Sequence, residues 1–219
     1  MPDPSRWLAF LVASIVLAAI PGPSLLFVIG RAISAGRREA LLSVLGNATG
    51  ILTQILLIAA GLGPVVASSA TAYAVVKAVG ALYLVYLGIS TIRHRDAASR
   101  ALREMDTRPQ RHAAHALRDG FLVGATNPKT IVFFVALLPQ FVTTGHGPVW
   151  MQLVILGLTF FAVAVASDSI VAVLAGRARD WLANSPGRLA RMNAAGGVMM
   201  ILLACALALT GRPAPAPTS

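Results

Sequence analysis

Apolar segments alternate with short charged connections along the whole chain. A helix needs about 20 apolar residues to cross the hydrocarbon core of a bilayer, and charged residues divide this sequence into six pieces of about that size. The predicted spans are residues 8–30, 40–66, 73–92, 119 to about 141, 150–176 and 192–210. The pattern therefore predicts an all-α membrane protein with six transmembrane helices. A turn is predicted between the second and third spans, marked by Gly61, Gly63 and Pro64 and by the small polar residues Ser68, Ser69 and Thr71.

The spans fall into two sets of three, separated by the longest charged connection. We predict a first three-helix repeat in residues 1–92, a basic cytoplasmic loop in 93–118, a second repeat in 119–211 and a disordered tail in 212–219. Because three is an odd number, the second set must enter the membrane from the side opposite to the first. The sequence thus predicts two inverted repeats, an arrangement common among secondary transporters.

Composition and charge agree with a membrane location. The chain is 57% hydrophobic and 12% charged, with a net charge of +10 and a mean hydropathy of +0.75, which is too apolar for a soluble domain. The basic residues lie between apolar spans rather than on one soluble surface, so we expect contact with lipid headgroups and no nucleic-acid partner. Arginines gather after the first, third and fifth spans, which predicts cytoplasmic basic loops and both termini outside.

Two spans contain residues that break helices. Pro21-Gly22-Pro23 interrupts the first span, and Asn127-Pro128-Lys129 interrupts the fourth. Proline removes a backbone donor, and a lysine near the bilayer centre costs roughly 2.5–3.5 kcal/mol on insertion scales. Broken helices leave carbonyl and amide groups free to bind the ammonium and carboxylate of a zwitterion. The alternative is that both prolines only kink their helices, whose free backbone groups are satisfied by neighbouring helices.

Two further polar residues lie at the depth of these breaks. Counted from the nearest charged connection, Pro23, Asn47, Pro128 and Asp168 are 8 to 10 residues into their spans, or roughly 12–15 Å at 1.5 Å per residue. Lys129 and Asp168 are the charged residues of this layer. We expect Lys129 to bind a substrate carboxylate and Asp168 to take up a proton or an ammonium group. The alternative is that the two charges only neutralise each other.

The remaining reactive side chains predict neither a metal centre nor an active site. His94, His112, His115 and His146 lie in loops without a cysteine or carboxylate at metal-ligand spacing. Cys205 is the single cysteine and lies in an apolar segment. The sequence also lacks a nucleophile with a matching base. We therefore expect no cofactor, no metal and no enzymatic activity.

Several motifs, taken in their order, resemble the LysE/RhtB amino-acid exporters, the lysine exporter and homoserine/threonine exporter type. The motifs are Pro21-Gly22-Pro23, the run from Lys77 through Gly80, Tyr83 and Tyr86 to Gly88, Gly120-Phe121, Asn127-Pro128-Lys129 and Leu138-Pro139-Gln140-Phe141. The resemblance covers nearly the whole chain. It implies a multi-pass protein of the bacterial inner membrane that exports amino acids with the proton-motive force.

The resemblance also implies where the transport site lies. Carried over by position, the broken-helix residues become the site, namely Pro21, Gly22, Pro23, Asn127, Pro128 and Lys129. From the depth of the residues we add Asn47 to the substrate site and Asp168 as the proton-coupling residue. Asp168 departs from the resemblance, since family members with an acid in the fifth span have it about one turn earlier, where this chain has Ala164.

The resulting hypothesis is a secondary active exporter of amino acids or close derivatives. The alternative is a channel, or an exporter of other small metabolites or ions; an accessory subunit without transport activity is a further possibility. The expected partners are an amino-acid substrate and membrane lipids. Glycine-rich faces, such as Gly46 with Gly50 and Gly80 with Gly88, suit helix packing and suggest a homodimer.

Overall fold

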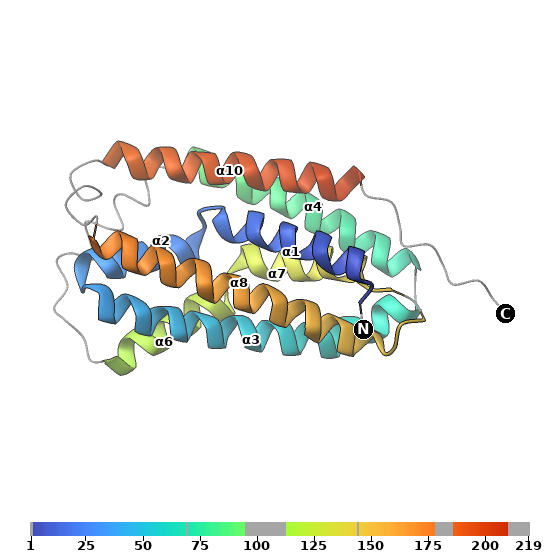
Figure 1. Cartoon of the computed structure of the whole chain (residues 1–219). Helices are drawn as coiled ribbons and strands as arrows, with labels where there is room; N and C mark the ends of the chain where they lie inside the picture. Colours follow the sequence, from blue (N-terminus) through green and yellow to red (C-terminus); the bar gives the residue numbers. More distant parts are fainter. Residues whose placement is uncertain (1, 69, 95–112, 144, 178–185, 210–219) are drawn as a thin grey trace.

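The computed structural model describes residues 2–68, 70–94, 113–143, 145–177 and 186–209, and within these ranges the chain forms helices and no strands (Figure 1). The helices are α1 (Pro4–Ala19), α2 (Pro23–Ser34), α3 (Arg37–Ser68), α4 (Ala70–Arg93), α6 (Ala113–Ala125), α7 (Pro128–Leu137), the 3₁₀ helix η1 (Leu138–Phe141), α8 (Val149–Arg177) and α10 (Pro186–Leu209). They lie side by side along one long axis (Figure 1). The all-helical prediction is confirmed for the described residues.

The two predicted helix breaks are present. The axes of α1 and α2 meet at 49°, and those of α6 and α7 with η1 meet at 41°. Pro23 and Pro128 are each the first residue of the second helix, where the missing N–H costs nothing and the fixed φ suits a helix start. Asn127 caps α7, since its side chain accepts a hydrogen bond from the Lys129 N–H.

Two long helices meet the length and composition needed to cross a membrane. They cover Arg37–Gly61 of α3 and Val149–Ala175 of α8, and each bent pair also passes when it is taken as one span, which gives up to four. In α4 and α10 the uninterrupted apolar stretches are shorter, Ala78–Arg93 and Ala194–Cys205. The described residues therefore support two to four spans by this measure, and the six-span arrangement stays a prediction.

Two helix boundaries differ from the sequence prediction. The predicted connection between the second and third spans is found where α3 ends at Ser68 and α4 begins at Ala70, but Gly61, Gly63 and Pro64 lie inside α3 rather than in a turn. Glycine and proline are tolerated inside transmembrane helices, where neighbouring groups satisfy the freed backbone. The helix of the fourth span begins earlier than predicted, at Ala113, within the segment taken as loop. Most of that predicted loop and the predicted disordered tail lie outside the described residues.

The helices pack in a defined set of pairs. The long helix α3 lies against both α6 and α8, α1 lies against α8, and α4 packs along α10. Phenylalanines from three helices form the centre of the main core, with Phe10, Phe133, Phe134 and Phe160 all buried. The ring centroids of Phe133 and Phe160 are 5.4 Å apart.

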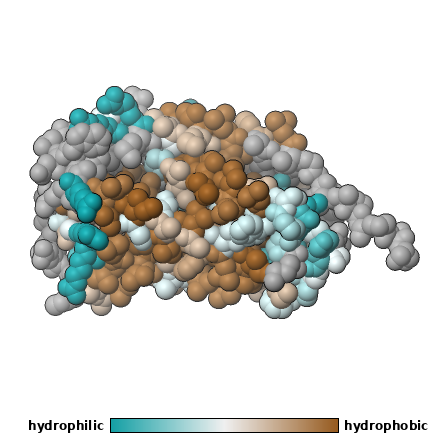
Figure 2. Space-filling model, viewed as in Figure 1, coloured by the Kyte–Doolittle hydropathy of each residue, from teal (hydrophilic) through white to brown (hydrophobic). Residues whose placement is uncertain are grey.

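The outside of the bundle is apolar over most of its length. Leu57, Leu82 and Leu202 are among many large hydrophobic side chains that are more than half exposed. Figure 2 shows this brown surface, with the teal hydrophilic residues mainly at the two ends. We call one end the basic end, because Arg37, at the start of α3, and Arg93, at the end of α4, are exposed there. An apolar surface of this extent suits a lipid environment.

Glycines let α3 and α6 approach so closely that their backbones are in contact. A Cβ atom on Gly46 would lie 2.0 Å from the Leu117 carbonyl oxygen, and one on Gly124 would lie 2.3 Å from the Asn47 carbonyl oxygen. Gly88 of α4 meets the carbonyl of Gly197 in α10 in the same way. The glycine faces that suggested a homodimer are therefore used for packing inside the chain.

Candidate functional site

The polar residues predicted to share one depth meet around a small cavity. Asn47 comes from α3, Asp168 from α8, Asn127 from the second break and Lys129 from the first turn of α7. Their side chains are only 1% to 7% exposed. The cavity has a volume of about 20 Å³, which is enough for a single water molecule and too small for an amino acid. In this conformation the site is closed.

A series of hydrogen bonds at this cavity connects the start of α7 to α2, α3 and α8. The Asn127 side-chain amide donates to the Ser24 hydroxyl oxygen (2.7 Å), and the Ser24 hydroxyl donates to Asn47 Oδ1 (3.0 Å). The Asn47 amide then donates to Asp168 Oδ2 (2.9 Å). Each of the four side chains in this series of hydrogen bonds thus has a buried partner, as burial away from water requires.

The ammonium group of Lys129 is bound at the first break. Its Nζ donates to the carbonyl oxygens of Leu17 (3.1 Å) and Ile20 (2.8 Å). These carbonyls belong to the last turn of α1 and its cap, where the helix dipole is negative; the Leu17 carbonyl also accepts from the Ile20 N–H (3.1 Å). The α7 lysine thereby satisfies the free end of α1.

Lys129 and Asp168 line the same cavity, yet these two described residues form no ion pair with each other. Lys129 donates to backbone carbonyls, whereas Asp168 accepts from Asn47. The two charges still attract each other across the cavity, so their mutual neutralisation stays an alternative interpretation. Ala164 lines the cavity as well, so an acid placed there, one turn earlier in α8, would reach the same space.

The helix-breaking residues shape the site rather than line it. Pro21 and Gly22 are buried in the first break, whereas Pro23 is exposed, and Pro128 begins α7. None of these four described residues is among those that line the cavity. Their contribution is to end α1 and α6 so that backbone carbonyls face the bundle interior.

Three site residues escaped the sequence analysis. Ser24 and Thr130 line the cavity directly, and Gln54 caps the second break by donating to the carbonyls of Gly124 (2.8 Å) and Ala125 (3.0 Å). Ser24 directly follows Pro21-Gly22-Pro23, and Gln54 is a mid-span amide two turns beyond Asn47. Position next to a break and helical spacing from Asn47 were the signals that could have found them.

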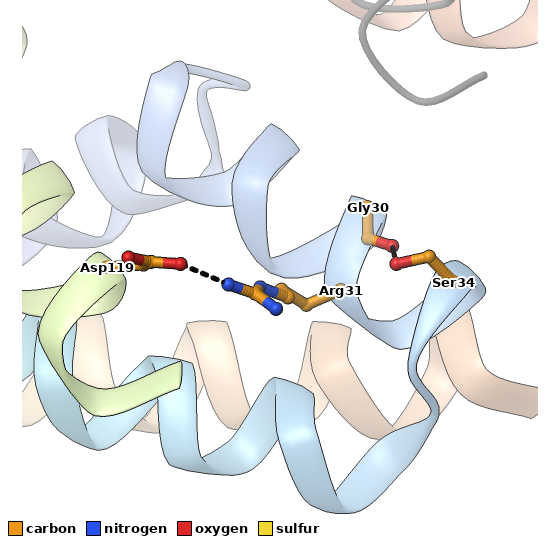
Figure 3. Close-up of polar contacts among 4 residues, drawn as sticks. All are labelled: Gly30, Arg31, Ser34 and Asp119. Carbon is orange, nitrogen blue, oxygen red and sulfur yellow. Dashed lines mark hydrogen bonds and ion pairs between the residues drawn. The ribbon is translucent and has the colours of Figure 1, made fainter. Parts of the chain in front are cut away.

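An ion pair joins the two halves of the chain near the basic end. Arg31 of α2 contacts Asp119 of α6 at 2.5 Å (Figure 3), with side-chain exposures of 11% and 28%. Arg31 also lies over the Phe27 ring at 5.4 Å. This pair lies where α2 approaches its end and α6 has begun, so it holds the two bent helices together on that side of the cavity.

A second and larger hollow has a different character. It lies between α4 and α7, has a volume of about 410 Å³ and is lined by apolar side chains together with Tyr83, Gly80 and Pro128. Val75 and Val79 on its wall are exposed. Its chemistry suits contact with lipid chains, so the small polar cavity is the candidate site. Among the described residues, no group of three His, Cys, Asp or Glu side chains is placed to bind a metal ion.

Comparison with known proteins identifies the family. The family model for LysE type translocators matches residues 15–211, which is most of the chain. The chain belongs to the LysE type translocator family. LysE family proteins are transporters rather than enzymes, and this member is a multi-pass protein of the bacterial inner membrane.

Several relatives of this LysE family member cover nearly its full length. A homoserine/homoserine lactone efflux protein of Salmonella typhimurium is 33% identical over 92% of this chain and 95% of its own length. An uncharacterized membrane protein of Vibrio cholerae is 36% identical over 89% and 92%. A leucine efflux protein of Klebsiella pneumoniae is 27% identical over 78% and 79%. No solved structure matches the chain significantly.

Proposed function

We propose that this protein exports amino acids, or close derivatives, from the cytoplasm as a secondary active transporter. The observation that carries the proposal is the closed polar cavity at two helix breaks, which holds one positive and one negative side chain inside an otherwise apolar bundle. Charged groups at membrane depth are costly and mark substrate or ion pathways. The relatives named as homoserine and leucine efflux proteins support amino acids as the substrate class.

The proposed substrate site consists of the cavity and the breaks that frame it. Asn47, Asn127 and Lys129 provide donors and acceptors for a zwitterion, and Lys129 provides the positive charge for its carboxylate. The breaks at Pro21, Gly22, Pro23 and Pro128 contribute the backbone carbonyls at the ends of α1 and α6, which side chains of the bundle occupy in this conformation. A site of this composition recognises the groups that all amino acids share. The surrounding apolar side chains then select among the variable groups.

We propose proton coupling through Asp168. Its carboxylate lies in the same cavity as the substrate groups and accepts a hydrogen bond from Asn47. A proton on Asp168 would remove the negative charge from the cavity. It would also change the acceptor of the Asn47 amide from a carboxylate to a neutral carboxyl group. Substrate and proton occupancy would therefore influence each other through Asn47, and such coupling is what an exchanger requires.

The proposed architecture has six spans in two inverted repeats, with both termini outside. The spans are α1 with α2, α3, α4, α6 with α7, α8 and α10. Exchanging the two halves replaces the contact between α3 and α6 by the one between α8 and α1, and leaves the α4–α10 and α3–α8 contacts in place. These pairs support a two-fold relation between the halves, whereas the contact between α4 and α7 has no counterpart of similar extent between α10 and α2 in the described residues.

A closed cavity favours a transporter over a channel. A channel needs a continuous polar path, whereas the polar layer here is bounded by the buried Phe133 and Phe160 on one side and the Arg31–Asp119 pair on the other. Alternating access would open one boundary at a time. The cavity must expand in either open state, because an amino acid does not fit in about 20 Å³.

Inverted membrane vesicles provide the test, because they turn export into accumulation. The experiment measures uptake of radiolabelled L-homoserine, L-leucine, L-threonine and L-lysine, with and without a proton gradient. We expect gradient-dependent accumulation of at least one of them, its loss in Asp168→Asn, and wild-type accumulation in Thr49→Ala. Thr49 is a matched control, because it is an exposed hydroxyl residue on α3 two positions from Asn47.

Two results would count against the proposal. If no amino acid accumulates under any gradient while the protein is inserted normally, the substrate class is wrong. If accumulation in Asp168→Asn keeps the full dependence on the gradient, Asp168 is not the proton-coupling residue.

A further inference from the structure

The ammonium group of Lys129 lies at a place that is built to bind an ammonium group. Two carbonyl oxygens, those of Leu17 and Ile20, accept from its Nζ at 3.1 Å and 2.8 Å. Both belong to the C-terminal end of α1, whose dipole adds partial negative charge. The lysine is only 6% exposed, so the ion has exchanged water for these carbonyls.

This lysine reaches the carbonyl pair from another helix. Lys129 is in α7, and its side chain crosses the first break beside Gly22, where an added Cβ atom would lie 3.2 Å from its Cδ, Cε and Nζ atoms. Gly22 thus leaves room for the end of the lysine side chain. Because four rotatable bonds connect Nζ to the backbone, the ammonium can leave the carbonyls without movement of α7.

The α-ammonium of an amino acid has the same chemistry as the lysine ammonium. Each is a compact cation with three N–H donors. We propose that the Leu17 and Ile20 carbonyls form the ammonium subsite of the transport site, and that Lys129 fills this subsite while no substrate is bound. This inference rests on the proposed function, since it names the part of that site that binds the substrate ammonium.

The displaced lysine then has a role of its own. An amino acid that places its ammonium on the carbonyl pair carries a carboxylate two bonds away, next to the place that Lys129 has just left. The freed Lys129 ammonium pairs with that carboxylate in the cavity lined by Asn127 and Asp168. The total charge buried at the carbonyl pair is the same before and after the exchange.

The second break is satisfied by a neutral group instead of a cation. There, the carbonyls of Gly124 and Ala125 accept from the neutral amide of Gln54. The two helix ends are therefore satisfied in different ways, one by an ammonium and one by an amide. Gln54→Ala frees the carbonyls of the second break and is the matched control for Lys129→Ala.

The test is rescue of Lys129→Ala by a small amine. The purified full-length variant is heated in detergent at constant ionic strength with methylammonium, and its unfolding temperature is compared with that in tetramethylammonium, which has no N–H donors. We expect a saturable rise of roughly 3 °C or more with methylammonium and none with tetramethylammonium. Wild type and Gln54→Ala should not respond to methylammonium.

A folding defect of the variant does not prevent a decision. If Lys129→Ala can be purified only when methylammonium is present, the subsite is supported. Lys129→Gln keeps N–H donors for both carbonyls, so it should fold without the amine and should not be stabilised by it. The proposal is overturned if methylammonium and tetramethylammonium have equal effects on Lys129→Ala, or if only Lys129→Gln can be purified and no amine recovers Lys129→Ala.

These outcomes are independent of the transport assay. Rescue without any amino-acid accumulation would support the ammonium subsite and contradict amino acids as the substrate class, so other amines would be tested as substrates. Accumulation of an amino acid without rescue would keep the exporter and remove this subsite from it.

Discussion

At the scale of single residues, Asn47 connects the elements of the site. Its side-chain amide N–H donates to Asp168, and its side-chain oxygen Oδ1 accepts from the Ser24 hydroxyl. Gly124 of α6 packs against its backbone. An asparagine is suited to this position because one side chain both donates and accepts. Replacing it affects two buried partners at once.

Asn47→Ala should therefore destabilise the protein strongly. The Ser24 hydroxyl and the Asp168 carboxylate would each lose a buried partner, and an orphaned buried polar group costs about 1–3 kcal/mol. In detergent, the unfolding temperature of Asn47→Ala should be clearly lower than that of wild type. Thr53→Ala, which removes a hydroxyl bonded only to its own helix, should lie within about 0.5 kcal/mol of wild type. Equal stabilities for the two variants would contradict the hydrogen-bonded chain.

The two charges of the cavity should depend on each other without forming an ion pair. Lys129→Met leaves Asp168 buried without an opposite charge, and Asp168→Asn does the same to Lys129. Neighbouring residues of this kind have interaction energies of about 0.5–3 kcal/mol, so the double variant should be less destabilised than the sum of the single ones. The unfolding temperatures of wild type, the two single variants and the double variant provide a double-mutant cycle. Additive effects would place the charges in separate environments.

Much of the site could be predicted from residue type and depth. Asn47, Asn127, Lys129 and Asp168 stand out because polar groups are costly inside apolar spans, and helical rise places them in one layer. Their hydrogen-bond partners within the protein could not be predicted, because the direction of a side chain depends on packing between helices. Ser24 could not be singled out either, because a serine in a helix usually bonds to its own backbone, as Ser14 does.

At the scale of helices, the breaks were predictable and the boundaries were not. Proline suits the first residue of α2 and of α7 through its covalent geometry. The ends of α3 and the start of α6 depend on the environment instead. Pro64 does not end α3, and the helix around His115 begins before the apolar run of the fourth span.

The close contact between α3 and α6 gives a prediction for two glycines of one helix. A Cβ atom on Gly50 would lie 2.4 Å from the backbone nitrogen of Ala125, whereas one on Gly61 would meet nothing within 4 Å. Gly50→Ala should cost about 1–3 kcal/mol through overpacking, and Gly61→Ala should stabilise the helix by about 0.5–1 kcal/mol. Thermal unfolding of both variants is the measurement. A neutral Gly50→Ala would mean that the helices separate easily.

The Arg31–Asp119 pair gives a second prediction at this scale. It connects α2 of the first half to α6 of the second half, and hydrogen bonds to charged groups are worth about 1.5–3 kcal/mol. Arg31→Gln should lower the unfolding temperature, and the exchange Arg31→Asp with Asp119→Arg should recover part of the loss. Arg37→Gln, on an exposed arginine at the same end, serves as control. No recovery in the exchanged pair would show that geometry rather than charge governs the contact.

At the scale of the whole molecule, contacts between helices lie on both sides of the polar layer. Towards the basic end, the Arg31–Asp119 pair joins the two halves. Towards the other end lie the packed rings of Phe10, Phe133 and Phe160. Arg6 of α1 also donates to the Val142 carbonyl there at 2.7 Å. In the proposed transport cycle, opening either end would require the halves to separate at a different set of contacts, as alternating access demands.

The orientation of the molecule can be tested with two cysteine variants in a Cys205→Ala background. Ala35 follows α2 at the basic end, and His146 lies in the connection before α8 at the opposite end. The positive-inside rule places the basic end in the cytoplasm. A membrane-impermeant maleimide should therefore label His146→Cys in intact cells and label Ala35→Cys only in inverted vesicles. The reverse pattern would invert the topology, so that a cavity opening towards the basic end would face the periplasm instead of the cytoplasmic substrate pool.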